Sequence, residues 1–129
     1  SPIPIALDEE LIGIFSVTNK QFLLQTIKPQ FIILKPTLVG GFKGSQEWID
    51  VAEFNKISWW VTSALESNIG LNAITQFTYT LHNLLPHGLG TGGLYTNNFD
   101  CTLSIKNGRI FNDVNLDWDV SLLINLNNK

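Results

Sequence analysis

The sequence has little charge, a single cysteine, no methionine and no long apolar run, and each scarcity excludes a class of protein. Its 8 basic and 11 acidic residues are scattered and give a formal net charge of −3. Such a balance offers no basic patch for nucleic acid or for an anionic membrane surface. No apolar stretch reaches the roughly 18 residues of a membrane-spanning helix, and no leader pattern occurs. We therefore expect no nucleic-acid partner, no membrane partner and a cytoplasmic location.

The single cysteine, Cys101, excludes an internal disulfide, and no cysteine–histidine spacing typical of a zinc site occurs. Apolar residues recur at every second position around it, at Phe99, Leu103 and Ile105. This alternation predicts a strand with Cys101 on the buried face. The pattern favours a packing role for the thiol over a reactive one.

Apolar runs and helical spacing indicate an alternation of strands and helices. They predict, in order, a strand at 3–7, a helix at 19–28, a strand at 31–34, a helix capped by Ser45 and reaching Phe54, a strand at 57–62, a helix from Ser67 or Asn68 to Leu81, and a glycine-rich strand or loop at 89–95. After that, Asn107-Gly108 between alternating residues predicts a β-hairpin.

Buried strands that alternate with single helices are typical of a parallel sheet built from right-handed strand–helix–strand units. Four such strands fit an open sheet or half of a closed barrel, since a whole eight-stranded barrel needs about 250 residues. An isolated half would leave two sheet edges unpaired. We therefore predict an α/β fold and expect the chain to be incomplete.

Polar groups follow the predicted strands at the points where the strands end. Asp8 follows the first, Lys35 the second and Ser63 the third, while the fourth is the glycine-rich segment 88–92. Because catalytic groups of parallel barrels project from the carboxyl ends of the strands, we expect these groups to line one pocket. Carboxylate oxygens suit a hard cation such as magnesium. A lysine that ends an apolar run emerges at the strand mouth or is buried, and buried lysines are almost always paired.

Each of these features also has an interpretation without function. A run such as Asp8-Glu9-Glu10 is more often a solvated loop or a helix start, and Lys35 could extend its ammonium to solvent. The glycine-rich segments lack the spacing of phosphate-binding loops. We interpret His82 and His87 as structural or exposed residues, since neither has a setting typical of catalysis.

Taken in order, the motifs resemble one family. Ile5-Ala6-Leu7-Asp8-Glu9-Glu10 resembles the fifth barrel strand of the enolase superfamily, and the segment 33–41, ILKPTLVGG, resembles the sixth strand of its o-succinylbenzoate synthases. The segment 61–71 is similar to the seventh strand with its loop, and 88–92 to the mouth of the eighth. The similarity runs in register from about Pro2 to Trp118.

This resemblance implies a domain organisation. Residues 1–98 would be the C-terminal half of an enolase-type (β/α) barrel of the TIM type, with about four parallel strands. Residues 99–129 would form the β-hairpin and tail that return to a capping domain. The family's general base and its other metal carboxylates have no counterpart before Ser1. The chain alone is therefore expected to be inactive and to need a missing N-terminal half as its partner.

The resemblance also implies a reaction and a set of site residues. The reaction is a lyase (dehydratase) step of menaquinone biosynthesis, in which 2-succinyl-6-hydroxycyclohexadiene-1-carboxylate, a small-molecule carboxylate, becomes o-succinylbenzoate through a metal-stabilised enediolate. Asp8 would bind Mg²⁺, for which Mn²⁺ is a possible substitute, and Lys35 would be the catalytic cation. The residues expected to bind substrate are Ser63, Glu66, Ser67, Gly90 and Thr91.

Two other functions stay open at this point. An N-succinylamino acid racemase or a dipeptide epimerase of the same superfamily would use Lys35 as a second base. A non-catalytic α/β binding module would account for the missing ligands without a missing half. The pairing of Lys35 with Pro36 favours the synthase.

Overall fold

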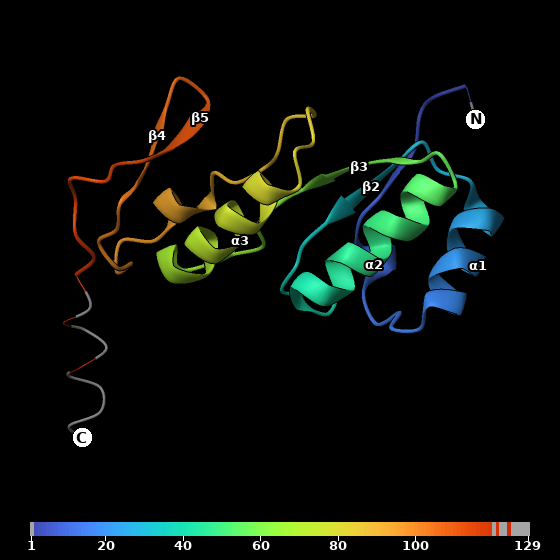
Figure 1. The fold of residues 1–129 in the computed structure, drawn as a ribbon, viewed down its shortest axis with the longest axis horizontal. Coiled ribbons are helices and arrows are strands. Elements are labelled where there is room, and N and C mark those ends of the chain that lie inside the picture. Colours follow the sequence, from blue (N-terminus) through green and yellow to red (C-terminus); the bar gives the residue numbers. More distant parts are fainter. Residues whose placement is uncertain (1, 120, 122–123, 125–129) are drawn as a thin grey trace.

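The computed structural model describes residues 2–119, 121 and 124, and it contains a parallel sheet with helices and a separate hairpin (Figure 1). The sheet has the order β1-β2-β3, with β1 at Ala6–Leu7, β2 at Phe31–Leu34 and β3 at Ser58–Val61. All pairs are parallel, with Ile32 beside both Leu7 and Trp59. The predicted α/β fold with parallel strands is therefore confirmed.

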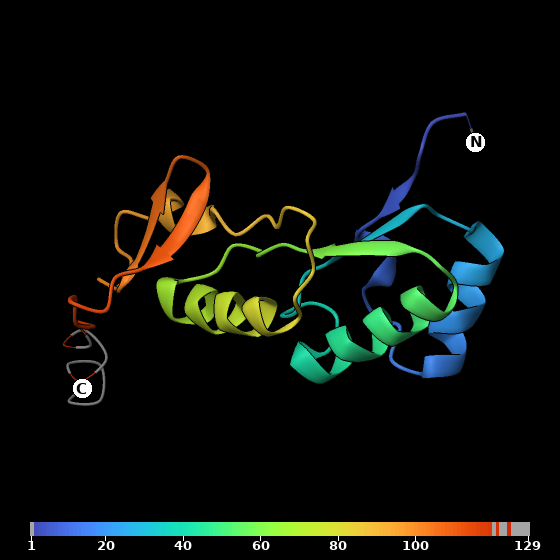
Figure 2. The ribbon, with the colours of Figure 1, turned by 45° about the horizontal axis from the view of Figure 1, so that its top comes forward.

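Helices connect the strands and lie on one side of the sheet. They are α1 (Val17–Ile27), α2 (Gly41–Phe54) and α3 (Asn68–Thr80). In Figure 2 all three lie below the strands, and no helix covers the opposite face in the described part of the chain. The apolar core lies between the strands and α1 and α2, where Leu11, Ile32, Leu34, Trp48, Ala52 and Val61 are fully buried. No described helix is long and apolar enough to cross a bilayer.

The predicted cap of α2 is wrong. Gly40, not Ser45, is the N-cap residue, and the helix begins at Gly41. The Ser45 hydroxyl lies inside the helix and donates to the carbonyl of Gly41 at 2.8 Å. The early start depends on Gly44, because a Cβ there would lie 2.1 Å from the carbonyl oxygen of Val39. Serine is a residue type typical of N-caps, but a serine that donates to the carbonyl of the preceding turn lies inside the helix and does not begin it.

Helix α1 packs on α2 through a buried cation. Ser16 caps α1, so the helix begins at Val17, two residues before the predicted start. Lys20 is 1% exposed and its ammonium binds the carboxylate of Glu47 at 2.7 Å. The same ammonium lies 5.5 Å from the centre of the Trp48 ring. The carboxylate and the ring face replace water as partners of this charge, which is how a buried lysine is tolerated.

The fourth parallel strand is reduced to one bridge. Thr62 pairs with Gly88 in parallel, and the following glycine-rich residues form a 3₁₀ helix, η2 (Thr91–Leu94). Ser67 caps α3, as one of the two predicted residues, and α3 ends at Thr80, before Pro86. The chain thus runs from the end of α3 back along the outer edge of β3 as a loop.

The hairpin is present where Asn107-Gly108 predicts it. Strands β4 (Leu103–Lys106) and β5 (Arg109–Asn112) pair antiparallel, and both turn residues have positive φ, as a two-residue hairpin of this type requires. Cys101 precedes β4 and is half-buried, so the predicted strand position on a buried face is wrong for this residue. That residues 99–129 belong to a capping domain stays a prediction.

Candidate active site at the strand ends

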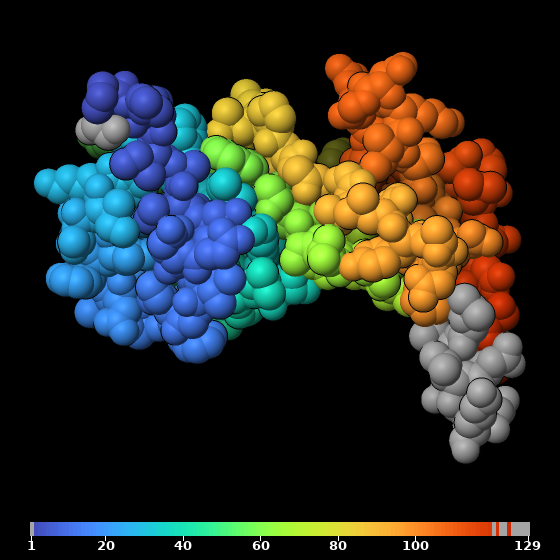
Figure 3. Space-filling model, turned by 180° about the vertical axis from the view of Figure 1, so that it is seen from behind, coloured from blue at the N-terminus to red at the C-terminus, as the bar shows by residue number. Residues whose placement is uncertain are grey.

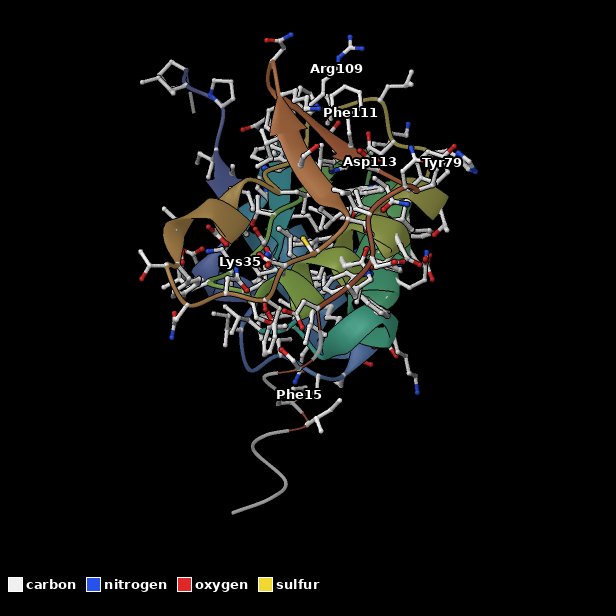
Figure 4. All side chains as sticks on the ribbon, turned by 90° about the vertical axis from the view of Figure 1, so that its left-hand side faces the viewer. Phe15, Lys35, Tyr79, Arg109, Phe111 and Asp113 are labelled. Atoms are coloured by element: carbon white, nitrogen blue, oxygen red, sulfur yellow. The ribbon has the colours of Figure 1, made fainter. Side chains whose placement is uncertain are left out.

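Asp8 and Lys35 meet at the carboxyl ends of β1 and β2. The Lys35 ammonium lies 2.8 Å from Asp8 Oδ2 and 2.8 Å from Glu9 Oε1. Adjacent parallel strands carry these residues one position beyond their last paired residues, so both side chains emerge at the same rim. Figure 4 labels Lys35. The expected convergence of an acidic group and an ammonium is present in the structure.

The electrostatics of this cluster favour the charged forms. Hydrogen bonds to Asp8 and then to Glu9 raise the pKa of Lys35, so its ammonium stays protonated at neutral pH. The hydrogen bond from Lys35 lowers the pKa of Glu9, whose side chain is 71% exposed. The side chains of Lys35 and Asp8 are 19% and 27% exposed. A charged pair that is reachable from solvent can bind a small anion or cation without being fully desolvated.

A divalent metal would find part of a binding site here. The carboxylates of Asp8 and Glu9 are the hard oxygen donors that magnesium prefers. No group of three or more His, Cys, Asp or Glu in the described part of the chain is placed to hold a metal ion. The residues present therefore fit a metal only as a partial donor set.

Two of the predicted substrate-binding residues contact each other beyond the end of β3. The hydroxyls of Ser63 and Thr91 lie 2.7 Å apart, and Ser63 Oγ also lies 3.3 Å from the carbonyl oxygen of Gly88. Ser63 is 7% exposed, whereas Gly90 is exposed and faces Ile105 of the hairpin. The bridge between Thr62 and Gly88 thus brings Ser63 and Thr91 together.

Glu66 faces the loop after β2. Its Oε1 accepts the Thr37 hydroxyl at 2.7 Å and the Ala64 amide at 3.2 Å. Glu66 is 9% exposed, so its carboxylate is compensated by these donors more than by water. Thr37 lies two residues after Lys35, so this bond joins the loop after β2 to the loop after β3. The sequence assigned no role to Thr37, and only its place in the 33–41 motif could have drawn attention to it.

We expect the Thr37→Val variant to unfold more easily. The substitution keeps the shape of the side chain but removes the donor to a buried carboxylate, which costs about 1.5–3 kcal/mol for a hydrogen bond to a charged group. Denaturant unfolding followed by circular dichroism measures this loss. Thr37→Ser, which keeps the hydroxyl, is the matched control and should stay close to the parent. Equal stability of the valine and serine variants would show that the bond contributes nothing.

The N-terminus of α3 is closed by side chains. Ser67 Oγ accepts the amide of Gly70 at 3.5 Å. The side-chain oxygen of Asn98 accepts the amide of Asn68 at 2.8 Å, and its nitrogen donates to the carbonyl of Gly92 at 3.0 Å. Asn98 therefore holds η2 against α3, next to the exposed Ser67. Nothing in the sequence around Asn98 indicated this role.

No protein-family model matches this sequence. Similar curated proteins are known, however. An o-succinylbenzoate synthase from Desulfotalea psychrophila is 51% identical over 108 residues, which are 84% of this chain and 29% of that protein. An o-succinylbenzoate synthase from Vibrio cholerae is 34% identical over 97 residues, or 72% of this chain and 28% of that protein. The chain thus spans about three tenths of the length of the curated relatives that it matches.

Solved structures give the same result for the fold. The crystal structure of MenC from Desulfotalea psychrophila superposes with a TM-score of 0.81 at 50% identity and covers 85% of this chain and 31% of that one. Muconate lactonizing enzyme from Pseudomonas putida shares the fold with a TM-score of 0.76 at 22% identity, over 96% of this chain and 36% of its own. The likeness expected from the strand-end motifs is confirmed: this chain is similar in sequence and in fold to a segment of the o-succinylbenzoate synthases of the enolase superfamily.

Proposed function

We propose that this chain supplies one side of the active site of an o-succinylbenzoate synthase. The observation that carries the proposal is the meeting of the Lys35 ammonium and the Asp8 carboxylate, 2.8 Å apart, at the ends of adjacent parallel strands. The identity of 51% to a synthase over 84% of the chain supports it. The reaction would be the dehydration of 2-succinyl-6-hydroxycyclohexadiene-1-carboxylate in menaquinone biosynthesis, in the cytoplasm.

The proposed reaction breaks a C–H bond and a C–O bond on neighbouring carbons of the substrate ring. A proton leaves the ring carbon that carries the carboxylate, and hydroxide leaves the neighbouring ring carbon. The electrons of the broken C–H bond form the last double bond of the aromatic ring. One water is released, and no oxidant or reductant is needed. Negative charge develops on the ring carboxylate as the proton departs, so a fixed positive charge beside it lowers the barrier.

Lys35 is the residue of this chain that would provide such a charge. Its ammonium is fixed by two carboxylates and stays protonated, because its hydrogen bonds to Asp8 and Glu9 raise its pKa. A cation held beforehand stabilises developing charge without reorganising solvent. It could also lie over the face of the aromatic product, where cation–π attraction is favourable.

Asp8 is the residue that would hold a divalent cation, for which we propose Mg²⁺ with Mn²⁺ as a substitute. When bound, the metal would supply positive charge to the substrate carboxylate. The fit is limited to the partial donor set described above, so a second portion of the same protein would complete the ligands and bring the base. The isolated chain should therefore lack activity.

The loop between β3 and α3 and the loop after α3 would bind the substrate. Ser63 and Thr91 offer paired hydroxyls, Gly90 offers exposed backbone, and Ser67 lies at the N-terminus of α3. The side chains of Asn98 and Ser67 already accept the amides of Asn68 and Gly70 there, so a carboxylate such as the succinyl group would be favoured by the helix dipole and not by these amides. Glu66 would act through its bond to Thr37, by fixing the shape of this pocket.

Two alternatives are weaker on present observations. The L-Ala-D/L-Glu epimerase from Bacillus subtilis has a TM-score of 0.71 but only 22% identity, so its likeness supports the fold alone. The same residues at the strand ends would also be compatible with an N-succinylamino acid racemase, in which Lys35 would act as a second base. A non-catalytic binding module would leave the convergence of Lys35, Asp8 and Glu9 at one rim without a purpose.

A chimera tests the proposal. In it, this chain replaces the matching segment of the Desulfotalea psychrophila synthase, which supplies the remaining seven tenths of that protein. We expect the chimera to convert the cyclohexadiene carboxylate to the aromatic product, measured by liquid chromatography. The parent synthase is the positive control for the assay, and circular dichroism verifies that the chimera is folded.

Two results would overturn the synthase assignment. A folded chimera that exchanges the α-proton of both enantiomers of an N-succinyl amino acid in deuterium oxide, without forming the aromatic product, would favour the racemase. A folded chimera that does neither would favour the binding module.

A further inference from the structure

The outer edge of β3 is paired by a loop, partly through its backbone and partly through side chains, and not by a strand. The backbone groups of Trp59, Val61 and Ser63 point away from β2, since the residues between them bond to β2. Gly88 is the backbone partner at this edge: its amide donates to the carbonyl of Val61 at 2.9 Å, and its carbonyl accepts from Ser63 at 2.9 Å. Two further backbone groups at this edge, the carbonyl of Trp59 and the amide of Val61, are paired by side chains.

Asn83 and His87 supply these partners. The Asn83 side-chain nitrogen donates to the carbonyl of Trp59 at 2.6 Å, and the Val61 amide donates to His87 Nδ1 at 3.0 Å. Buried backbone groups need such partners, because an unpaired one costs about as much as a lost hydrogen bond. The loop from 82 to 88 thus continues the sheet with an amide side chain, an imidazole and a single glycine.

The bond to Val61 defines the form of His87. An imidazole nitrogen accepts a hydrogen bond only when it carries no proton, so Nδ1 is bare and the ring is neutral with its proton on Nε2. Protonation would place an N–H opposite the N–H of Val61. Burial lowers the pKa of His87 below its ordinary value of 6.5 and outweighs the backbone hydrogen bonds that raise it, so the neutral form is favoured.

His87 borders a cavity of about 680 Å³ between the end of α3, the loop and the hairpin. Figure 3 shows this hollow between the segment after α3 and the hairpin. The other titratable groups that line it are Tyr79, His82 and Arg109. In Figure 4 Tyr79 and Arg109 lie far from Lys35, so the cavity is separate from the cluster of Lys35, Asp8 and Glu9.

We propose that His87 is a positioning residue: in its neutral form it fastens the loop to β3 and so sets the place of the Ser63–Thr91 pair, and its protonation releases that loop. Gly88 follows His87 directly, and Thr91 is three residues beyond Gly88. A shift at His87 therefore passes through a short segment to the proposed substrate residues. The consequence for catalysis rests on the proposed function, whereas the fastening of the loop does not.

The direction of the pH effect follows from linkage. Because the pKa of His87 is lower in the folded state, the unfolded chain binds this proton more readily. The contribution of His87 to stability is complete above about 6.5, falls as the pH drops below that value, and levels off below the folded-state pKa.

Histidine-selective ¹⁵N NMR and amide exchange on the 129-residue chain, repeated in the chimera, test the proposal. We expect His87 to show a bare Nδ1 and a protonated Nε2 at neutral pH. Amide exchange of Val61, Gly88 and Ser63, corrected for its intrinsic pH dependence, should accelerate by about tenfold as His87 becomes protonated, as for the loss of one hydrogen bond.

His87→Asn is the informative variant, because an asparagine oxygen can take the place of Nδ1 and does not titrate. It should keep the protection of the Val61 amide and remove the pH dependence. His82→Asn, the control in the same cavity, should leave that dependence unchanged. In an active chimera we expect KM to rise as the pH falls below about 6.5, because release of the loop displaces the Ser63–Thr91 pair. His87→Asn should abolish this rise while kcat stays near the parent value.

Three results would overturn the proposal. The first is a proton on Nδ1 of His87 at neutral pH in the parent chain, a measurement that needs no variant to fold. The second is exchange at Val61 and Gly88 that is insensitive to protonation of His87. The third is loss of the pH dependence in His82→Asn. None of these readouts depends on turnover, so an inactive chimera contradicts the proposed function and leaves this test intact.

Discussion

Replacing Lys35 by alanine should lower kcat of the chimera by a factor on the order of 10² or more, because a charge fixed beside developing negative charge contributes at least that much. The ammonium is the residue's contribution in our proposal, and alanine removes it entirely. KM should change little, since the cation stabilises the transition state more than the bound substrate. Steady-state kinetics with the cyclohexadiene substrate measure the split.

The variant should keep its fold. Lys35 is part of an ion pair at a rim that solvent reaches, and such pairs contribute about 1 kcal/mol or less. Lys43→Ala, which removes an exposed ammonium at the start of α2, is the matched control and should leave kcat unchanged. If Lys35→Ala turned over nearly as fast as the parent, Lys35 would have no part in the chemistry.

Asp8→Asn should raise the magnesium concentration needed for half-maximal activity of the chimera. The substitution keeps the size of the side chain but replaces a charged oxygen by a neutral amide, and carboxylates are the protein ligands that hold this ion. The loss of one anionic ligand should weaken binding by about tenfold or more. Isothermal titration with Mg²⁺ gives the affinity without turnover, and activity against Mg²⁺ concentration gives a second measure.

Asp50→Asn is the control for this experiment. Asp50 is an exposed carboxylate of α2 that accepts a hydrogen bond from Gln46 at 2.9 Å, away from the strand ends. Its loss should change neither magnesium affinity nor activation. Equal magnesium affinities of the Asp8 variant and the parent would remove Asp8 from the metal site and leave it as a partner of Lys35 alone.

Much of the fold was predictable because local patterns carry it. The apolar run Phe31–Leu34 is the central strand β2, and the turn Asn107-Gly108 is the hairpin turn. Each of these elements depends on residues that are close in sequence. The hairpin turn, for example, needs two adjacent residues that adopt positive φ. The start of α2 was predicted wrongly, because the close approach of Gly44 to Val39 decides it, and no periodicity reports such an approach.

The site was predictable in part for a related reason. Asp8 and Lys35 each follow a strand, and parallel strands bring their carboxyl ends to one rim, so their meeting follows from topology. The roles of Glu9, Thr37 and Asn98 do not follow, because their bonds depend on how the loops pack against one another and not on the direction of the strands. No sequence pattern assigned Thr37 to Glu66.

The sequence by itself therefore determined the order of the strands and helices, the parallel sheet and the two charged residues that end β1 and β2. Tertiary structure alone decided which side chains complete those elements: the buried Lys20 on Glu47, Thr37 on Glu66, and His87 as an acceptor at the edge of β3. The physical reason is that periodicity reports which face of an element is apolar, whereas the partner of a polar group depends on how separate elements pack.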